Sequence, residues 1–284
     1  MAECSARKLS PITAAQAEAG RHCLQTLLNC YCREVAGPNG QVSFGSPFGQ
    51  NDWPLGLRAA VVDGQVMHLH LPHTATRLIG AVEEPVPLGR LRLRSSLYGR
   101  TPGRAWAPLD WAGLAALLIR ELSLSQDVPF NDDLLAQIRD SVETVHAILS
   151  SRPTPAPSSG LQQYIEAEQA LVLGHPFHPA PKSRQGFNDQ DRLLYSPELR
   201  TSFPLHWFAV RKDMLHQRTL LTHQPDEIIA RHAPVAAAPG YSLVPAHPWQ
   251  AGHILGLRSV RKMLADQTIR DLGPLGKAYL PTSS

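Results

Sequence analysis

Apolar residues recur at helical spacing near the start of the chain and again before residue 150. Four large side chains share one face of a helix expected over residues 14–35: Leu24, Leu27, Leu28 and Tyr31. Asp110 is suited to cap a second helix that runs to about Leu122, and Asn131 or Asp132 to begin a third that continues to Leu149. The first half of the chain is therefore expected to contain amphipathic helices.

Between residues 42 and 106 the pattern changes to short apolar runs separated by glycine and proline. This pattern predicts an antiparallel sheet, with strands at Leu57–Val62, Val66–Leu71 and Gly89–Leu97 and a turn at Asp63-Gly64. Within the last run, RLRLR at residues 90–94 alternates arginine with leucine, so one face is apolar and the other cationic. The cationic face is either solvated or a wall that faces an anion.

His68 and His70 share one face of an expected strand, and we interpret them as a surface pair in preference to a metal site. Four cysteines lie within the first 32 residues, and Cys30-x-Cys32 lacks the spacing of a zinc knuckle. We interpret the cysteines as buried structural residues.

Residues 150–160 read SSRPTPAPSSG and contain no bulky apolar side chain, which predicts a semi-rigid exposed linker. We therefore expect one domain over residues 1–150 and another over residues 161–284. The expected elements of the second domain are a helix at Leu161–Leu173 ended by Gly174, a strand at Leu205–Arg211, a helix at Pro225–His232 and a strand at Tyr241–Ala246. Pro248 then starts a short helix, with His247 at the junction. The predicted class is mixed α/β (α+β).

Composition excludes several classes of protein. With 43% hydrophobic and 18% charged residues the chain is neither disordered nor membrane-like, and its longest apolar run, Trp111–Ile119, is too short to span a bilayer. The first residues carry no apolar segment typical of a secretory signal, so we expect a cytoplasmic protein. A formal charge of +3 is too small to indicate a nucleic-acid partner, although small anionic ligands fit it.

The segment from Gly174 to Phe187 reads GHPFHPAPKSRQGF. His175 and His178 each precede a proline, which disfavours the α region and makes the loop stiff. Lys182 and Arg184 are two residues apart, so in extended backbone both cations project to one side, and the nearby glycine lets a ligand approach the main chain. These features predict a phosphate clamp. Solvated loop cations and a zinc site at the histidine pair are the alternatives.

This loop resembles the ATP-site motif of the NRPS-independent siderophore synthetases, the aerobactin-synthetase-like (IucA/IucC) family. Four more segments agree in the same order: Tyr195–Glu198 (YSPE), Leu205–Val210 (LHWFAV), Pro245–Gln250 (PAHPWQ) and Pro281–Ser284 (PTSS). The resemblance covers residues 166–284, whereas the first 150 residues match only in general character. The family's last motif in this region reads S-x-R-T, and the chain contains only its first serine, Ser284.

The resemblance implies a siderophore-biosynthetic, acid-amine ligase that uses ATP and Mg²⁺ to adenylate a carboxylate of citrate or a related acid, and then condenses it with an amine or an alcohol. The nucleotide-binding candidates are Lys182, Arg184, His178, His175, Ser284, Ser283 and His247. Lys182 and Arg184 would neutralise phosphates, and His178 or His175 would bind a phosphate oxygen. His247 is either near the nucleotide or a packed junction residue. No catalytic residue and no metal ligand is assigned.

The resemblance also implies a hand-like fold, with residues 1–150 as the thumb, residues 161–284 as the start of the fingers and no palm. We therefore expect an N-terminal part of a synthetase that is incomplete and inactive as an isolated chain: a truncated gene product, one half of a split gene or an expression fragment. A separately encoded C-terminal half or a second copy of the chain would be its partner. The alternative is a non-catalytic binding or regulatory remnant of the same fold.

Overall fold

The computed structural model describes residues 13–45, 52–61, 65–83, 89–152, 159–220 and 222–282. Internal contacts divide the chain into unit 1, residues 1–152 and 171–186, and unit 2, residues 153–170 and 187–284. The chain thus leaves unit 1 inside the predicted linker, most of which (153–158) lies outside the described residues. It then returns to unit 1 for residues 171–186, a return that the sequence did not indicate.

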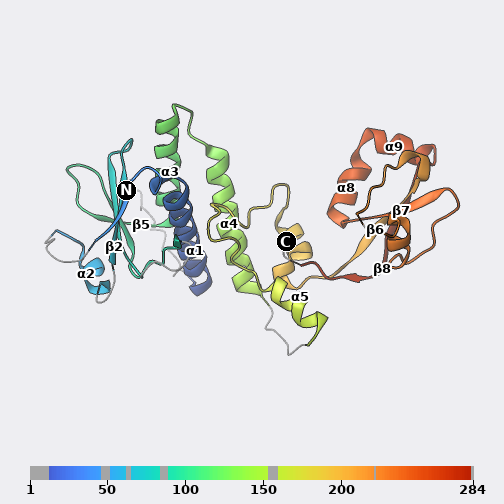
Figure 1. The fold of residues 1–284 in the computed structure, drawn as a ribbon, viewed down its shortest axis with the longest axis horizontal. Coiled ribbons are helices and arrows are strands. Elements are labelled where there is room, and N and C mark those ends of the chain that lie inside the picture. Colours follow the sequence, from blue (N-terminus) through green and yellow to red (C-terminus); the bar gives the residue numbers. More distant parts are fainter. Residues whose placement is uncertain are drawn as a thin grey trace, which may run out of the picture. The chain divides into compact units, whose positions relative to one another are not determined.

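Unit 1 contains a five-stranded antiparallel sheet in the order β1-β2-β3-β4-β5. Its strands are β1 (Val42–Gly45), β2 (Gln65–Leu71), β3 (Thr76–Val82), β4 (Leu97–Arg100) and β5 (Ala107–Leu109). Three helices, α1 (Ala14–Tyr31), α3 (Trp111–Gln126) and α4 (Asp132–Ser151), lie side by side next to it (Figure 1). The expected helices and the antiparallel sheet are confirmed.

Polar caps start helices α3 and α4 where the sequence predicted. Asp110 Oδ1 accepts the Gly113 N–H at 2.8 Å at the start of α3, and Asn131 Oδ1 accepts the Leu134 N–H at 2.9 Å at the start of α4. Helix α1 continues as a short π-helical turn, η1 (Cys32–Ala36). No helix in the described part of the chain combines the length and the apolar character needed to cross a membrane.

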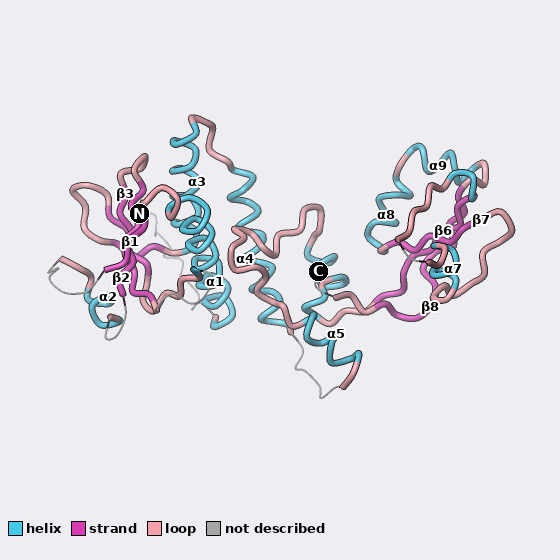
Figure 2. Tube along the Cα trace, in the orientation of Figure 1, coloured by secondary structure: helices cyan, strands magenta, loops and turns pink. Residues whose placement is uncertain are grey.

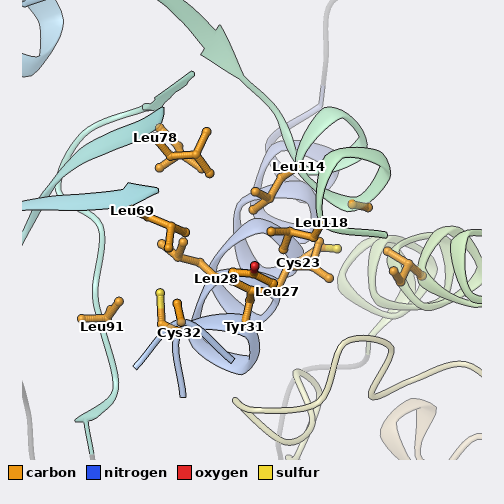
Figure 3. Close-up of a cluster of buried hydrophobic side chains, with 14 of the residues drawn as sticks. Cys23, Leu27, Leu28, Tyr31, Cys32, Leu69, Leu78, Leu91, Leu114 and Leu118 are labelled. Carbon is orange, nitrogen blue, oxygen red and sulfur yellow. The ribbon is translucent and has the colours of Figure 1, made fainter. Parts of the chain in front are cut away.

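The sheet of unit 1 buries apolar residues on both faces, because successive residues of a strand point to opposite sides. Leu69 and Leu78 pack with α1 and α3 in the main cluster, which Figure 3 shows with the labelled side chains of both helices. Cys23 and Cys32 are part of this cluster, and burial raises the pKa of both thiols to about 12, which agrees with a structural role. Ile79 packs in a smaller cluster on the other face.

Two expected strands of unit 1 are wrong. Residues 55–60 form helix α2. Only Leu57 of this segment is buried, as part of the smaller cluster, whereas a strand would bury every second residue. The turn at 63–64 lies outside the described residues. In the segment 89–97 only Leu97 belongs to a strand, and Leu93 forms one isolated bridge with Val82.

Unit 2 is built on a three-stranded antiparallel sheet in the order β7-β6-β8. Its elements are α5 (Leu161–Gln169), α6 (Asp189–Tyr195), η3 (Pro197–Leu199), β6 (Phe203–Arg211), η4 (Lys212–Met214), α7 (Pro225–Ala230), β7 (Tyr241–Ala246), α8 (Pro248–Gly256), α9 (Arg258–Ala265) and β8 (Ile269–Tyr279). Helices α7, α8 and α9 each contact the sheet, around which Figure 2 shows them. The expected strands β6 and β7, helix α7 and the Pro248 helix start are confirmed, whereas α5 ends at Gln169 and not at Leu173.

Candidate functional site

The segment from Gly174 to Gly186, which we call the His-Pro loop, belongs to unit 1 and is bound through its backbone to helix α4. The N–H of Lys182 donates to Ser141 Oγ at 3.0 Å, and the N–H of Arg184 donates to Asp140 Oδ2 at 3.2 Å. Ser141 and Asp140 are neighbours on a regular helix. The helix therefore fixes two alternate residues of the loop, which is the support that a precise binding site needs.

Two further contacts shape the start of the His-Pro loop. Gly174 has a φ of 73°, and a Cβ placed there would lie only 2.7 Å from the Cβ of Pro181, so the position requires glycine. The guanidinium carbon of Arg33 lies 4.6 Å from the centre of the Phe177 ring, a cation–π contact between α1's π-helical extension and the loop. Phe177 lies between the two histidines in the sequence, so this contact joins the histidine-bearing part of the loop to the end of α1.

His175 and His178 share one local geometry. The N–H of Phe177 donates to His175 Nδ1 at 3.2 Å, and the N–H of Ala180 donates to His178 Nδ1 at 3.1 Å. An Nδ1 atom that accepts a hydrogen bond carries no proton, so each neutral ring carries its proton on Nε2. Both residues are exposed. The loop therefore presents two imidazole Nε2–H donors that can bind an oxygen acceptor.

Lys182 departs from the extended conformation that its spacing from Arg184 predicted. Ser183 N–H donates to Ala180 O at 3.3 Å, so Lys182 lies in a turn. Its side chain is buried, with the residue 6% exposed, and Nζ donates to Leu171 O at 2.6 Å. A buried ammonium needs such acceptors. Arg184 is half-buried.

The carbonyl groups just before the His-Pro loop are held by side chains of unit 1. Lys182 Nζ donates to Leu171 O, and His22 Nε2 donates to Leu173 O at 2.7 Å. Burial lowers the pKa of His22 below its ordinary value of 6.5, although this hydrogen bond opposes the effect. Because these carbonyls bind side chains of unit 1, residues 171–173 do not extend helix α5 as the sequence predicted.

His247 lies in unit 2 and repeats the geometry of the loop histidines. It caps helix α8, with the Trp249 N–H donating to its Nδ1 at 3.1 Å, so its ring proton also lies on Nε2. The ring packs edge-on against Tyr195 and Phe203, each at 4.7 Å between centroids. Burial lowers the pKa of His247 below its ordinary 6.5, which keeps the ring neutral. His247 thus packs at the strand-to-helix junction, and its contact with a nucleotide stays a prediction.

Ser283 and Ser284 lie outside the described residues. The segment before them is anchored within unit 2, because Gln169 Nε2 donates to Pro281 O at 2.9 Å and both residues are buried. The structure therefore places four candidates, His175, His178, Lys182 and Arg184, on one loop of unit 1, and His247 in unit 2.

Sequence reasoning missed the two α4 residues that hold the loop. Ser141 interrupts the apolar face of α4 between Ile138 and Val145, and a small polar residue on a buried face indicates a polar partner from another segment. Asp140 gave no such signal. Among the residues that the structure describes, no three His, Cys, Asp or Glu side chains lie close enough together to hold a metal ion.

Comparison with known proteins matches residues 163–284 to the IucA / IucC family. The chain is 35% identical over 164 residues to the rhizobactin siderophore biosynthesis protein RhbC of Rhizobium meliloti (strain 1021), a match that covers 54% of this chain and 28% of that protein. It is 30% identical over 190 residues to the spermidine-citrate ligase of Bacillus anthracis, covering 62% of this chain and 32% of the ligase.

Among solved structures, the fold is similar to the ATP-bound aerobactin synthetase IucA from a hypervirulent pathotype of Klebsiella pneumoniae, with a TM-score of 0.72 and 25% identity. That match covers 92% of this chain and 45% of the synthetase. The chain therefore spans about a third or less of the two curated relatives and less than half of the solved synthetase.

Proposed function

Since residues 163–284 of the chain belong to the IucA/IucC family, we propose that the protein forms the N-terminal part of an ATP-dependent siderophore synthetase. Its reaction would activate a citrate-type carboxylate and join it to an amine or an alcohol. The names of the relatives support this proposal, because one is a citrate ligase and the solved synthetase carries bound ATP. In the hand-like description, residues 1–150 would be thumb-like and residues 161–284 the start of the fingers.

In the proposed first step a carboxylate oxygen of the acid attacks the α-phosphorus of ATP, the bond to the bridging oxygen breaks, and pyrophosphate leaves. In the second step the amine or alcohol attacks the acyl carbon, AMP leaves, and the nucleophile loses its proton. The first step brings an anionic carboxylate against an anionic triphosphate. Hydrogen-bond donors and cations must therefore be fixed around the phosphates before reaction.

The observation that carries the proposal is the matched geometry of His175 and His178. Each ring is oriented by a hydrogen bond from its own loop, so little conformational freedom is lost when Nε2–H meets a phosphate oxygen. We propose that Arg184 adds a guanidinium that can bind two phosphate oxygens at once. Lys182 adds a second positive charge, whose position is fixed by its bond to Leu171 O.

Family resemblance is the support for His247, Ser283 and Ser284 as further nucleotide contacts, and we retain them as part of the proposal. Mg²⁺ would accompany ATP. Among the described residues no three His, Cys, Asp or Glu side chains form a group that could hold a metal ion, and no step is assigned to Mg²⁺. We also expect residues 1–284 alone to release pyrophosphate far more slowly than a relative of full length.

Two substitutions of one residue test the role of the loop histidines. His178→Asn keeps an acceptor for the Ala180 N–H but has no donor in the place of Nε2, whereas His178→Gln keeps a donor near that place. We expect His178→Asn to retain its melting temperature and to bind ATP about tenfold to a hundredfold more weakly, as for a hydrogen bond to a charged group. His178→Gln should lose less. His70→Asn, at an exposed position of strand β2, is the matched control.

ATP binding is measured by calorimetry, and pyrophosphate release is measured with citrate and an amine. Wild-type affinity for ATP in His178→Asn would refute the assigned donor. ATP binding without pyrophosphate release, in a protein joined to the remainder of a synthetase, would favour the non-catalytic binding module. Release that depends on both citrate and an amine would support the ligase.

A further inference from the structure

Unit 1 contains a groove of about 1210 Å³ between helix α1 and residues 90–97, and none of the His-Pro loop residues to which we assign ATP lines it. Four arginines line it: Arg21, Arg90, Arg92 and Arg94. Three of them are the alternating arginines whose sequence allowed either a solvated face or a wall that faces an anion. The structure shows where that face lies, because its arginine side chains border an open concave surface.

The backbone of the arginine-bearing segment is fixed on one edge by side chains of α1. Gln25 Nε2 donates to Leu91 O at 2.7 Å, and Gln25 Oε1 accepts the Leu93 N–H at 2.8 Å. Asn29 Oδ1 accepts the Leu91 N–H at 2.8 Å. These amides take the place of a neighbouring strand.

On its other edge the same segment is bonded to the end of β3. Glu83 N–H donates to Arg92 O at 2.9 Å, and Arg94 N–H donates to Ala81 O at 2.8 Å. Leu91 consequently points into the main apolar cluster, Leu93 packs against that cluster at the border of the groove, and the arginines line the groove. The arginine backbone is therefore held in place before any ligand binds.

The carboxylates of the groove do not fully balance the positive charge of its four arginines. Its carboxylates are Glu18, Glu83 and Asp110. Asp110 caps helix α3, and Glu83 approaches Arg92 and Arg94 only at 3.8 and 4.0 Å. His22 also lines the groove, but it stays neutral because burial lowers its pKa.

Arg90 is the strongest indication of a missing partner. Its Nε is buried and has no hydrogen-bond acceptor among the described residues, and a buried donor without an acceptor is destabilising. Arg21 likewise forms no ion pair within the described part of the chain. An anion in the groove would pair with the charge of both guanidinium groups. Guanidinium groups bind carboxylate and phosphate alike through paired N–H groups, so an anion with either group fits these arginines.

We propose that this groove binds a small organic anion that carries two or more phosphate or carboxylate groups. Arginines at alternate positions of an extended segment lie about 6.5 Å apart, so one singly charged ion cannot reach all of them. Leu93, Leu97 and Leu109 also line the groove and would contact an apolar part of the ligand. The site uses none of the residues assigned to ATP.

The test is calorimetric titration of the purified chain with inorganic tripolyphosphate and, separately, with tricarballylate, at low salt of about 50 mM so that charge interactions are not screened. We expect one equivalent of at least one probe to bind. The double variants Arg90→Gln/Arg92→Gln and Arg92→Gln/Arg94→Gln should each lose about tenfold or more in affinity. The second pair is exposed in both positions, so it tests the site without disturbing a buried atom.

Arg104→Gln, in an exposed turn of unit 1 outside the groove, should change the affinity less than about twofold, which excludes a general effect of net charge. Arg184→Gln should also leave it unchanged, which separates this groove from the proposed ATP site. The preferred probe tells whether phosphate or carboxylate is recognised. Absence of binding by both probes, or equal loss in Arg104→Gln and the double variants, would overturn the proposal.

Discussion

Glu121 of α3 offers a sharp test of the forces that hold unit 1. Its residue is 1% exposed, yet its carboxylate accepts four hydrogen bonds from the turn between β2 and β3. Oε1 accepts the His73 N–H and His73 Nδ1, both at 3.0 Å. Oε2 accepts the Thr74 N–H at 2.7 Å and the Thr74 hydroxyl at 2.8 Å. One side chain therefore joins a helix to a sheet turn.

The expected loss of stability follows from the donors that each substitution leaves without an acceptor. In Glu121→Gln an NH₂ group replaces one carboxylate oxygen. The side-chain partner of that oxygen, the Thr74 hydroxyl or the His73 ring, can then accept a hydrogen bond in place of donating one. The backbone N–H that the oxygen had bound loses its acceptor, which should lower the free energy of unfolding by about 1–3 kcal/mol. In Glu121→Ala all four donors lose their acceptor, and we expect about 3–5 kcal/mol, as when one partner of a buried charged pair is removed. Alanine should thus be more harmful than glutamine.

Hydrogen exchange of the amides of strands β2 and β3, which do not bind Glu121, measures this loss in unit 1 alone during urea titration. Glu143→Gln, on an exposed position of α4, should change stability by less than about 0.5 kcal/mol. If Glu121→Ala unfolded at the urea concentration of the wild type, or Glu121→Gln were the more harmful variant, the reasoning on unsatisfied donors would be wrong.

The same carboxylate sets the direction of a pH effect. Burial alone would raise the pKa of Glu121, but the hydrogen bonds from His73 and Thr74 outweigh it and hold the pKa below the ordinary 4.5. A lowered folded-state pKa means that the ionised form stabilises the fold above pH 4.5, and that this stabilisation is lost as the pH falls through the folded value. The difference between wild type and Glu121→Gln should accordingly be constant near pH 7 and shrink in acid.

Three further outcomes are expected. Arg184→Ala should weaken ATP use about tenfold to a hundredfold in steady-state kinetics, and unchanged kinetics would remove Arg184 from the proposed site. Gly174→Ala should lower the free energy of unfolding by about 1–3 kcal/mol because of strain at a positive φ, seen as a lower melting temperature, and an unchanged melting temperature would show that Pro181 can move aside. Because burial raises the pKa of Cys23 and Cys32 to about 12, neither thiol should react with a maleimide at pH 8 until urea unfolds unit 1, as mass spectrometry can follow.

The elements that sequence reasoning found are those whose signals are local. The caps Asp110 and Asn131 and the start of α8 at Pro248 depend on residues within one turn of each other. Strand β8 was missed because Gly273 and Gly276 resemble turn residues, although this strand pairs with β6 along its length. The segment 90–94 was predicted as a strand of a sheet, but one edge is satisfied by side chains more than 60 residues away, which no local pattern encodes.

The candidate site likewise contains features that local sequence predicts and features that depend on distant residues. The His-Pro-X hydrogen bond spans two residues and occurs at His175, His178 and His247, so the position of the ring proton follows from local sequence in all three.

Lys182 is different, because its burial depends on Leu171 and on helix α4, and the spacing of cations along the loop cannot show it. A buried ammonium beside exposed imidazoles still raises the positive potential that an anion meets, whether or not Nζ touches it. Loss of activity on replacing Lys182 would therefore not distinguish a direct contact with the anion from a structural role of this side chain. The paired substitutions at His178, in contrast, change one hydrogen-bonding group at a time.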